Sequence, residues 1–270
     1  MTSPETRPDL DLGTPLLDVN GVTLRYKTPE HLVTATYRVS FEVYEAERFV
    51  ILGPSGCGKS TMLKAIGGFL PPVEGEIRIR DKLVRGPGPD RMMVFQEFEQ
   101  LMPWKTVLQN VTFPMNVTGR FNRKEARERA LSALDKVNLS KFSDIYPHML
   151  SGGMKMRVAI ARAMAMEPEV LLMDEPFAAL DALTRRKMQE ELLGLWEQLK
   201  FTVLFVTHSI EEAVIVGSRI LVLSPHPGRV RAELNSGIDL DTPSRDALSE
   251  RIHKLLFEEA VEPEPEVEVT

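Results

Sequence analysis

The sequence predicts an α/β fold in which helices cover both faces of a mainly parallel sheet. Four short apolar runs support this prediction, at residues 49–52, 92–95, 170–173 and 203–206. Because each run is apolar at consecutive positions, we expect strands that are buried on both faces, as parallel strands are. Helical patterns separate the runs, which is the order of elements in a parallel α/β sheet.

The stretch from about residue 97 to 165 differs, because it has helical patterns and no clear strand. It predicts an α-helical subdomain inserted into the α/β domain. Asn122 is placed to cap a helix with an apolar stripe at Ala126, Ala130, Leu131, Leu134 and Val137. Near the end of the chain, Thr242 and Pro243 are typical of an N-cap and a first helical position. That helix would bury Leu248, Ile252, Leu255 and Leu256.

The composition is ordinary for a globular protein and narrows the classes of partner. The 270 residues are 43% hydrophobic, and the formal net charge of -6 gives no general attraction to nucleic acid. The single cysteine, Cys57, excludes a disulfide within the chain and suits a reducing compartment. No apolar run approaches the about 18 residues of a spanning helix, and no leader peptide is visible. We therefore expect a soluble protein whose membrane role, if any, comes through a partner.

Residues 53–61 match the pattern G-x-x-x-x-G-K-[S/T] and follow the predicted strand at 49–52. Glycines allow successive backbone N–H groups to surround a phosphate, and the following helix begins at its positive end. Lys59 adds a full charge for the β- and γ-phosphates, and the hydroxyl of Ser60 is placed to bind Mg²⁺. The predicted phosphate loop consists of Gly53, Pro54, Ser55, Gly56, Cys57, Gly58, Lys59, Ser60 and Thr61.

Polar residues follow three other predicted strands. Asp174 and Glu175 end the run at 170–173, at the edge where parallel α/β sheets bind ligands. Adjacent residues on one strand point to opposite sides, so we expect Asp174 to hold Mg²⁺ and Glu175 to polarise an attacking water. His208 follows the run at 203–206 as a candidate γ-phosphate sensor, and Gln96 follows Phe95 as a candidate ligand of metal or water.

Residues 150–155, Leu-Ser-Gly-Gly-Met-Lys, complete a set of motifs that resembles the ABC transporter ATPase family. Ser151 reads as an N-cap, and Gly152 and Gly153 expose the backbone of a second helix N-terminus. The resemblance covers roughly residues 16–235, with the motifs in the family's order. It implies a P-loop NTPase core, an N-terminal antiparallel β region and an inserted helical subdomain. It also implies a dimer, in which the signature of one subunit closes over the nucleotide held by the other.

The same resemblance assigns further residues. It makes Gln96 the Q-loop glutamine, Asp174 the Walker B aspartate, Glu175 the catalytic glutamate, Asp181 a D-loop residue and His208 the switch histidine. Tyr26 lies where the family stacks adenine on an aromatic ring. The implied cofactors are ATP and Mg²⁺. The implied partners are a second ATPase subunit, transmembrane permease subunits and, indirectly, a solute-binding protein, at the cytoplasmic face of the cell membrane.

Several short stretches of the sequence resemble one branch of the family, which serves nitrate, sulfonate, taurine and bicarbonate importers. These stretches are Phe95-Gln96-Glu97, residues 101–107, Asn110-Val111 and residues 223–229. Met156 departs from that branch, which usually has glutamine there, and Ala178 stands where many relatives have serine or glycine. Neither departure removes a phosphate ligand, so ATPase activity is expected. The apolar group Phe98, Leu101, Met102, Pro103 and Trp104 is expected to border the contact with the pore subunit.

Two other functions remain open on the sequence. An ABC-type ATPase acting on nucleic acid or ribosomes tends to have tandem ATPase domains, long insertions or basic arms, whereas this chain has one set of motifs and net negative charge. A non-catalytic nucleotide-binding regulator is disfavoured by the presence of Lys59, Asp174, Glu175 and His208. The predicted organisation is a disordered tail at 1–15, an ATPase domain at 16–240, a C-terminal helix at 241–259 and an acidic disordered tail at 260–270.

Overall fold

The computed structural model describes residues 13–27, 32–95, 100–236 and 242–257. The strands are β1 (Leu17–Lys27), β2 (Leu32–Val43), β3 (Arg48–Leu52), β4 (Glu74–Ile79), β5 (Lys82–Leu83), β6 (Arg91–Val94), β7 (Val170–Asp174), β8 (Thr202–Thr207), β9 (Arg219–Leu223) and β10 (Val230–Asn235). The α-helices are α1 (Lys59–Ile66), α2 (Val107–Thr118), α3 (Arg123–Lys136), α4 (Gly152–Met164), α5 (Ala182–Leu199), α6 (Ile210–Val216) and α7 (Thr242–Phe257). Two single-turn 3-10 helices, Ser140–Phe142 and Pro147–Met149, precede α4.

The larger sheet has the strand order β10-β9-β3-β8-β7-β6. All neighbouring pairs are parallel except β9 and β10. The four predicted apolar runs are β3, β6, β7 and β8, so the prediction of a mainly parallel sheet is confirmed. The bounds differ by one residue at several ends; β6 stops at Val94, and β7 extends to Asp174.

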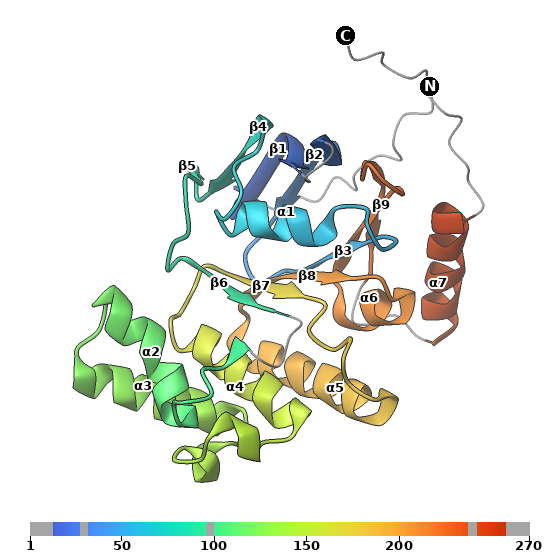
Figure 1. The fold of residues 1–270 in the computed structure, drawn as a ribbon. Helices are drawn as coiled ribbons and strands as arrows, with labels where there is room; N and C mark the ends of the chain where they lie inside the picture. The colour runs from blue at the N-terminus through green and yellow to red at the C-terminus, as the bar shows by residue number, and fades with distance from the viewer. Residues whose placement is uncertain (1–12, 28–31, 96–99, 237–241, 258–270) are drawn as a thin grey trace.

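The smaller sheet has the order β2-β1-β4-β5 and is antiparallel throughout. It supplies the N-terminal antiparallel region expected from the family resemblance. Helix α1 lies between this sheet and the larger one, so the core has three layers at this point (Figure 1). The predicted fold class is therefore confirmed.

Strand β3 shows why consecutive apolar residues are needed at the centre. Phe49 and Ile51 belong to the core shared with the antiparallel sheet and α1. Val50 and Leu52 belong to the core on the opposite face, which includes residues of α4, α5 and α6. All four side chains are fully buried, as expected for a strand covered on both faces.

Helices α2, α3 and α4 form a lobe beside the sheet, at the lower left of Figure 1. Asn122 caps α3 as predicted, because its side chain accepts hydrogen bonds from the N–H groups of Lys124 and Glu125, both at 3.0 Å. Glu125 completes a capping box. The buried residues of the predicted stripe are Ala126, Ala130, Leu134 and Val137, while Leu131 is only partly buried. The boundaries of the subdomain, about 97–165, stay a prediction.

Helix α7 packs against α6 and β9. Ile252 and Leu256 are buried, and Leu248 and Leu255 pack on the core as partly buried residues. Thr242 is the first helical residue rather than the N-cap, so that predicted cap was wrong by one position. The predicted terminal tails lie almost wholly outside the described residues.

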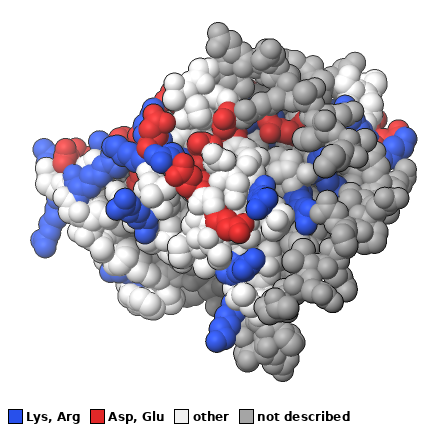
Figure 2. Space-filling view, turned by 90° about the horizontal axis from the view of Figure 1, so that it is seen from above, with Lys and Arg blue, Asp and Glu red and all other residues white. Residues whose placement is uncertain are grey.

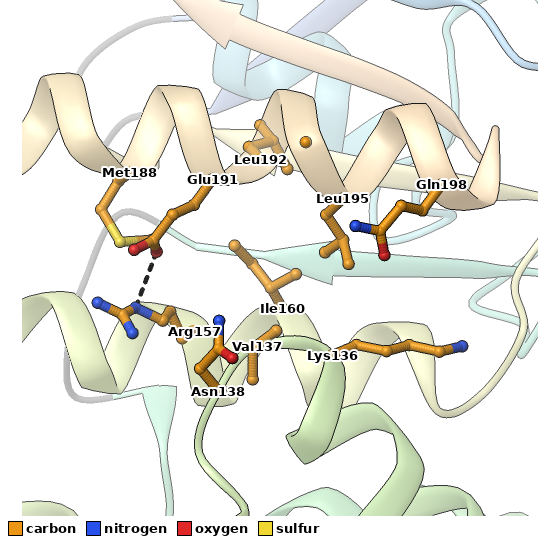
Figure 3. Close-up of a pocket in the computed structure, with 11 residues that line it drawn as sticks. Lys136, Val137, Asn138, Arg157, Ile160, Met188, Glu191, Leu192, Leu195 and Gln198 are labelled. Atoms are coloured by element: carbon orange, nitrogen blue, oxygen red, sulfur yellow. Dashed lines mark ion pairs between the residues drawn. The ribbon is translucent and has the colours of Figure 1, made fainter.

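A small cavity separates the helical lobe from α5 (Figure 3). Its volume is about 170 Å³, and apolar side chains of Ile160, Leu192 and Leu195 line it beside the ion pair of Arg157 and Glu191, whose atoms Nε and Oε2 lie 2.9 Å apart. Gly194 also borders this cavity, and a methyl group added there meets nothing within 4 Å. The cavity is smaller than typical ligand pockets, so it leaves room for a side-chain change rather than for a nucleotide.

We expect Gly194→Ala to raise the free energy of unfolding by roughly 0.5–1 kcal/mol, because alanine loses less backbone entropy than glycine in a helix. Gly217→Ala provides the opposite case, since its Cβ would lie 2.7 Å from the carbonyl oxygen of Ala213 and 2.9 Å from Cγ2 of Val50. Thermal unfolding of both variants checks the expectation. A lower midpoint for Gly194→Ala, or an unchanged one for Gly217→Ala, would contradict this packing.

Candidate functional site

Three adjacent strands of the larger sheet end at the same edge and bring distant segments together. Strand β8 lies between β3 and β7, and all three run parallel. Their pairing places Leu52 opposite Thr207 and Asp174 opposite Val206. The phosphate loop after β3, the acids at the end of β7 and His208 after β8 therefore meet at the carboxyl edge, where open α/β sheets bind ligands.

The phosphate loop turns sharply before α1. Gly56 and Gly58 have φ values of 84° and 93°, which side chains rarely tolerate, and Gly58 is the N-cap of α1. The Lys59 side chain folds back over the loop, and its Nζ donates to the carbonyl oxygens of Gly53 at 2.9 Å and Pro54 at 3.0 Å. The loop thus holds a buried ammonium group beside the exposed residues Ser55 and Gly56.

Two other parts of the chain support the loop from either side. A Cβ on Gly58 would lie 2.6 Å from the carbonyl oxygen of Ala35 in β2. A Cβ on Gly228 would lie 2.1 Å from the carbonyl oxygen of Cys57. Gly228 is itself held by β2, because its N–H donates to Ala35 and its carbonyl accepts from Tyr37. This support was not predicted, because residues 223–229 served only to narrow the branch of the family. The glycine between Pro227 and Arg229 is the signal that the sequence offers for it.

The side chain of Cys57 points away from the phosphate site. It is fully buried in the core that α1 shares with the antiparallel sheet. Burial raises the pKa of the thiol, which disfavours the reactive thiolate. The residue therefore contributes its backbone to the loop and its side chain to packing.

Ser60 and Asp174 face one another at the start of α1 and the end of β7. The Ser60 hydroxyl donates to Oδ1 of Asp174 at 2.8 Å. Burial raises the pKa of Asp174, although the hydrogen bond from Ser60 opposes the shift. A neighbouring cation would favour the ionised form. A hydroxyl and one carboxylate are the oxygen ligands that Mg²⁺ takes from proteins when phosphates supply the rest, so these two residues fit the ion. Among the described residues no cluster of three or more His, Cys, Asp or Glu side chains could bind a metal without such phosphates.

Glu175 joins Lys59 to His208. Its Oε1 lies 3.9 Å from Nζ of Lys59, and its Oε2 lies 2.9 Å from Nδ1 of His208. The histidine donates this hydrogen bond in the tautomer that carries its proton on Nδ1. The Glu175 side chain is 17% exposed, whereas that of His208 is 52% exposed.

The backbone of Glu175 lies outside β7 in the left-handed region, with φ 43°. We expected Asp174 and Glu175 to point to opposite sides because they were adjacent on one strand. That reason was wrong, since Glu175 is not part of the strand. The two carboxylates do have different partners, because the chain turns between them. A non-glycine residue at positive φ is strained, and such strain gathers at functional sites.

The other predicted site residues are more dispersed. Tyr26 lies near the end of β1, opposite Val33, and is 43% exposed. The carboxylate of Asp181 caps α5 by accepting from the N–H of Thr184 at 3.0 Å. Hydrogen bonds from the side chain of Thr184, and then from its backbone, lower the pKa of Asp181. Thr61 lies in the first turn of α1. Gln96 lies outside the described residues.

The predicted signature begins α4. Ser151 is its N-cap, and its hydroxyl accepts from the N–H of Met154 at 3.3 Å. Gly152 and Gly153 are the first two helical residues. In the described part of the chain, no hydrogen bond or ion pair joins residues 151–153 to the phosphate loop. Met156, the departure from the branch pattern, is buried in the core.

Acidic and basic side chains are interspersed on the face shown in Figure 2, without a broad basic area among the coloured residues. None of the described helices has the length and apolar composition needed to cross a membrane.

Comparisons with known proteins lead to the same family as the sequence motifs. Residues 36–178 match the ABC transporter family. The taurine import ATP-binding protein of Rhizobium johnstonii is 50% identical over 215 residues, 80% of each chain. The nitrate import ATP-binding protein of Synechocystis is 45% identical, covering 78% of this chain and 79% of that protein. A dimeric, post-hydrolysis ATP-binding cassette with ADP and phosphate bound superimposes with a TM-score of 0.69 at 37% identity, covering 81% of this chain and 98% of the other.

We expect Gly228→Ala to weaken ATP binding, because the new methyl group would displace the backbone of the phosphate loop at Cys57. Gly86→Ala is the matched control, since a Cβ at Gly86 meets nothing within 4 Å. Equilibrium titration with a fluorescent ATP analogue measures both affinities. An affinity for Gly228→Ala equal to that of the control, in a folded protein, would show that the loop does not depend on this contact.

Proposed function

We propose that this chain, which belongs to the ABC transporter family and is an ATPase of that family, energises the uptake of a small solute. The solute is anionic and passes through transmembrane permease subunits. The observation that carries the proposal is the meeting of Lys59, Ser60, Asp174, Glu175 and His208 at one edge of the sheet. Relatives named for the import of nitrate, an anion, and of taurine, which carries a sulfonate group, support a solute with an anionic group.

ATP binds along the phosphate loop in this proposal. Lys59 and the backbone N–H groups of residues 53–61 neutralise the β- and γ-phosphates, and Tyr26 stacks on the adenine. Ser60 and Asp174, with Gln96, would hold Mg²⁺, which would supply positive charge beside the phosphates. Glu175 accepts a proton from the attacking water or orients it, and His208 contacts the γ-phosphate beside it.

The site is completed by a second copy of the chain or by a close relative. Ser151, Gly152 and Gly153 present the positive N-terminus of α4, which suits an anionic γ-phosphate. The dimeric state of the similar solved cassette supports a contact between this helix N-terminus and the phosphate loop of the other copy. Asp181, at the N-terminus of α5, adds to the same dimer seam.

The permease contact is proposed at an exposed apolar surface of the helical lobe. Trp104 is 71% exposed, whereas its neighbour Leu101 is buried in the core. The buried side chain of Asn110 fixes this turn by hydrogen bonds to the backbone of Met102, Lys105 and Thr106. A rigidly presented aromatic residue is a good interface anchor. Phe98, also predicted here, lies outside the described residues.

Such a subunit works at the inner face of the cell membrane, attached through its permease partners. The permease and a solute-binding protein bind the solute, and this chain supplies the energy for its transport. No role on nucleic acid or ribosomes is favoured by the import proteins that this chain resembles.

Glu175→Gln is expected to bind Mg·ATP, form an ATP-dependent dimer and lower the rate of hydrolysis at least about a hundredfold, since a group that moves or orients a proton contributes ~10²–10⁴ in rate. The amide keeps the size of the side chain but loses its charge. Phosphate release and size-exclusion chromatography with Mg·ATP measure the two properties.

Two further variants separate the steps. Lys59→Ala is expected to lose nucleotide binding, and Ser151→Arg is expected to bind ATP but fail to dimerise. Hydrolysis by Glu175→Gln near the wild-type rate, or the absence of any ATP-dependent dimer with or without membrane partners, would refute the proposed roles.

Trp104→Ala is expected to weaken assembly with the permease and solute uptake while the basal ATPase rate of the purified subunit stays close to wild type. Co-purification with the permease and uptake into proteoliposomes test this. Leu32→Ala is the matched control, because Leu32 is also exposed, at 65%, but lies on β2 in the antiparallel sheet. If Trp104→Ala failed to fold, or if both variants lost assembly equally, the assignment of Trp104 to the permease interface would be wrong.

A further inference from the structure

A buried carboxylate, that of Glu212, is hydrogen-bonded to the residue that precedes His208. Glu212 is the third residue of α6 and is only 5% exposed. Its backbone N–H donates to the hydroxyl of Ser209, the N-cap of that helix, at 3.3 Å. Burying a carboxylate is unfavourable unless hydrogen bonds replace the lost water, so the partners of this side chain show which parts of the structure it joins.

Both carboxylate oxygens of Glu212 have a partner. Oε2 accepts from the hydroxyl of Thr207 at 2.5 Å, and Oε1 accepts from Nε2 of Gln189 at 3.3 Å. The Thr207 oxygen in turn accepts from the N–H of Ser209 at 3.0 Å. A capping box would join the glutamate directly to that N–H. Here the Thr207 hydroxyl lies between the Glu212 carboxylate and the N–H of Ser209 and bonds to both. These hydrogen bonds therefore fix the backbone on either side of His208.

The histidine depends on this backbone because little else orients it. Its side chain is 52% exposed, and its described hydrogen bond is the one to Glu175. Thr207 precedes it at the end of β8 and Ser209 follows it. Gln189 extends the network to α5, the helix capped by Asp181. One buried carboxylate thus ties the end of β8, the start of α6 and the middle of α5 together.

We infer that Glu212 is a positioning residue for ATP hydrolysis, which holds His208 in place through the Thr207 hydroxyl. The inference rests on the proposed role of His208 at the γ-phosphate. Glu212 touches neither nucleotide nor water in this account, so it should affect the rate of the chemical step rather than the binding of ATP. If the residue served only to stabilise α6, its loss would lower thermal stability without a specific effect on turnover.

The first test uses Thr207, where two conservative variants are possible. Thr207→Val removes the hydroxyl at similar size, and Thr207→Ser retains it. We expect Thr207→Val to lower kcat about 10- to 100-fold, as small misplacements of catalytic groups do, with KM and the affinity for a fluorescent ATP analogue unchanged. Thr207→Ser should keep kcat close to wild type. Equal kcat values for the two variants would overturn the inference.

The second test uses Glu212 with a matched control at the other end of α6. The hydroxyl of Ser236 is fully buried and donates to the carbonyl oxygen of Val214 at 3.1 Å. Ser236→Ala should lower the thermal midpoint but leave kcat unchanged. Glu212→Ala should lower kcat as Thr207→Val does, and Glu212→Gln should recover most of it, because the amide oxygen still accepts from Thr207 once Gln189 turns its own amide. A kcat for Glu212→Ala equal to that of Ser236→Ala would assign the residue to stability alone.

The last test is a double-variant cycle in the full chain. If Glu212 acts through His208, then Thr207→Val should cause no further loss of single-turnover phosphate release in the His208→Ala background. Losses that multiply would refute the inference and leave the proposed function intact. An unchanged rate in His208→Ala itself would instead refute the role of His208, and the inference with it. Should Glu212→Ala fail to fold, the Thr207 variants decide the question.

Discussion

The parallel pairing of β3, β8 and β7 is the constraint on which the site depends. Because these strands share a direction and are neighbours, their carboxyl ends emerge together, and three segments far apart in sequence meet there. The fully buried side chains of β3 are packed between two cores, so this edge cannot shift without disturbing both. The cluster of Lys59, Glu175 and His208 is thereby supported by rigid elements, although Glu175 and His208 lie on loops.

At that edge the polar side chains form two groups. Ser60 and Asp174 contact one another and suit a cation, whereas Glu175 contacts Lys59 and His208, and these three suit phosphate and water. The turn at Glu175, with its positive φ, separates the two carboxylates. The loop is braced by Gly228 and β2, which leaves its backbone N–H groups little freedom to reorganise.

Local features were predictable because the residues that cause them are close in sequence. The apolar strands, the Asn122 cap and the phosphate loop each follow from a short pattern. Features that depend on distant contacts were not. The burial of Cys57, the close approach of Gly228 to the loop and the hydrogen bonds of Glu212 need the tertiary structure, since their partners lie on other elements. The turn at Glu175 was missed because an acid ending an apolar strand reads as part of the strand.

The central claim is that a complete ATPase site takes its phosphate loop from one chain and its signature from another. Because Cys57 is the only cysteine, Cys57→Ala gives a background in which Ser55→Cys and Ser151→Cys can report their proximity, with Glu175→Gln added to prevent turnover. Ser55 and Ser151 are both exposed in the single chain. The account predicts a disulfide-linked dimer that forms with Mg·ATP and not without nucleotide. A linkage within one chain, or no linkage at saturating Mg·ATP, would contradict it.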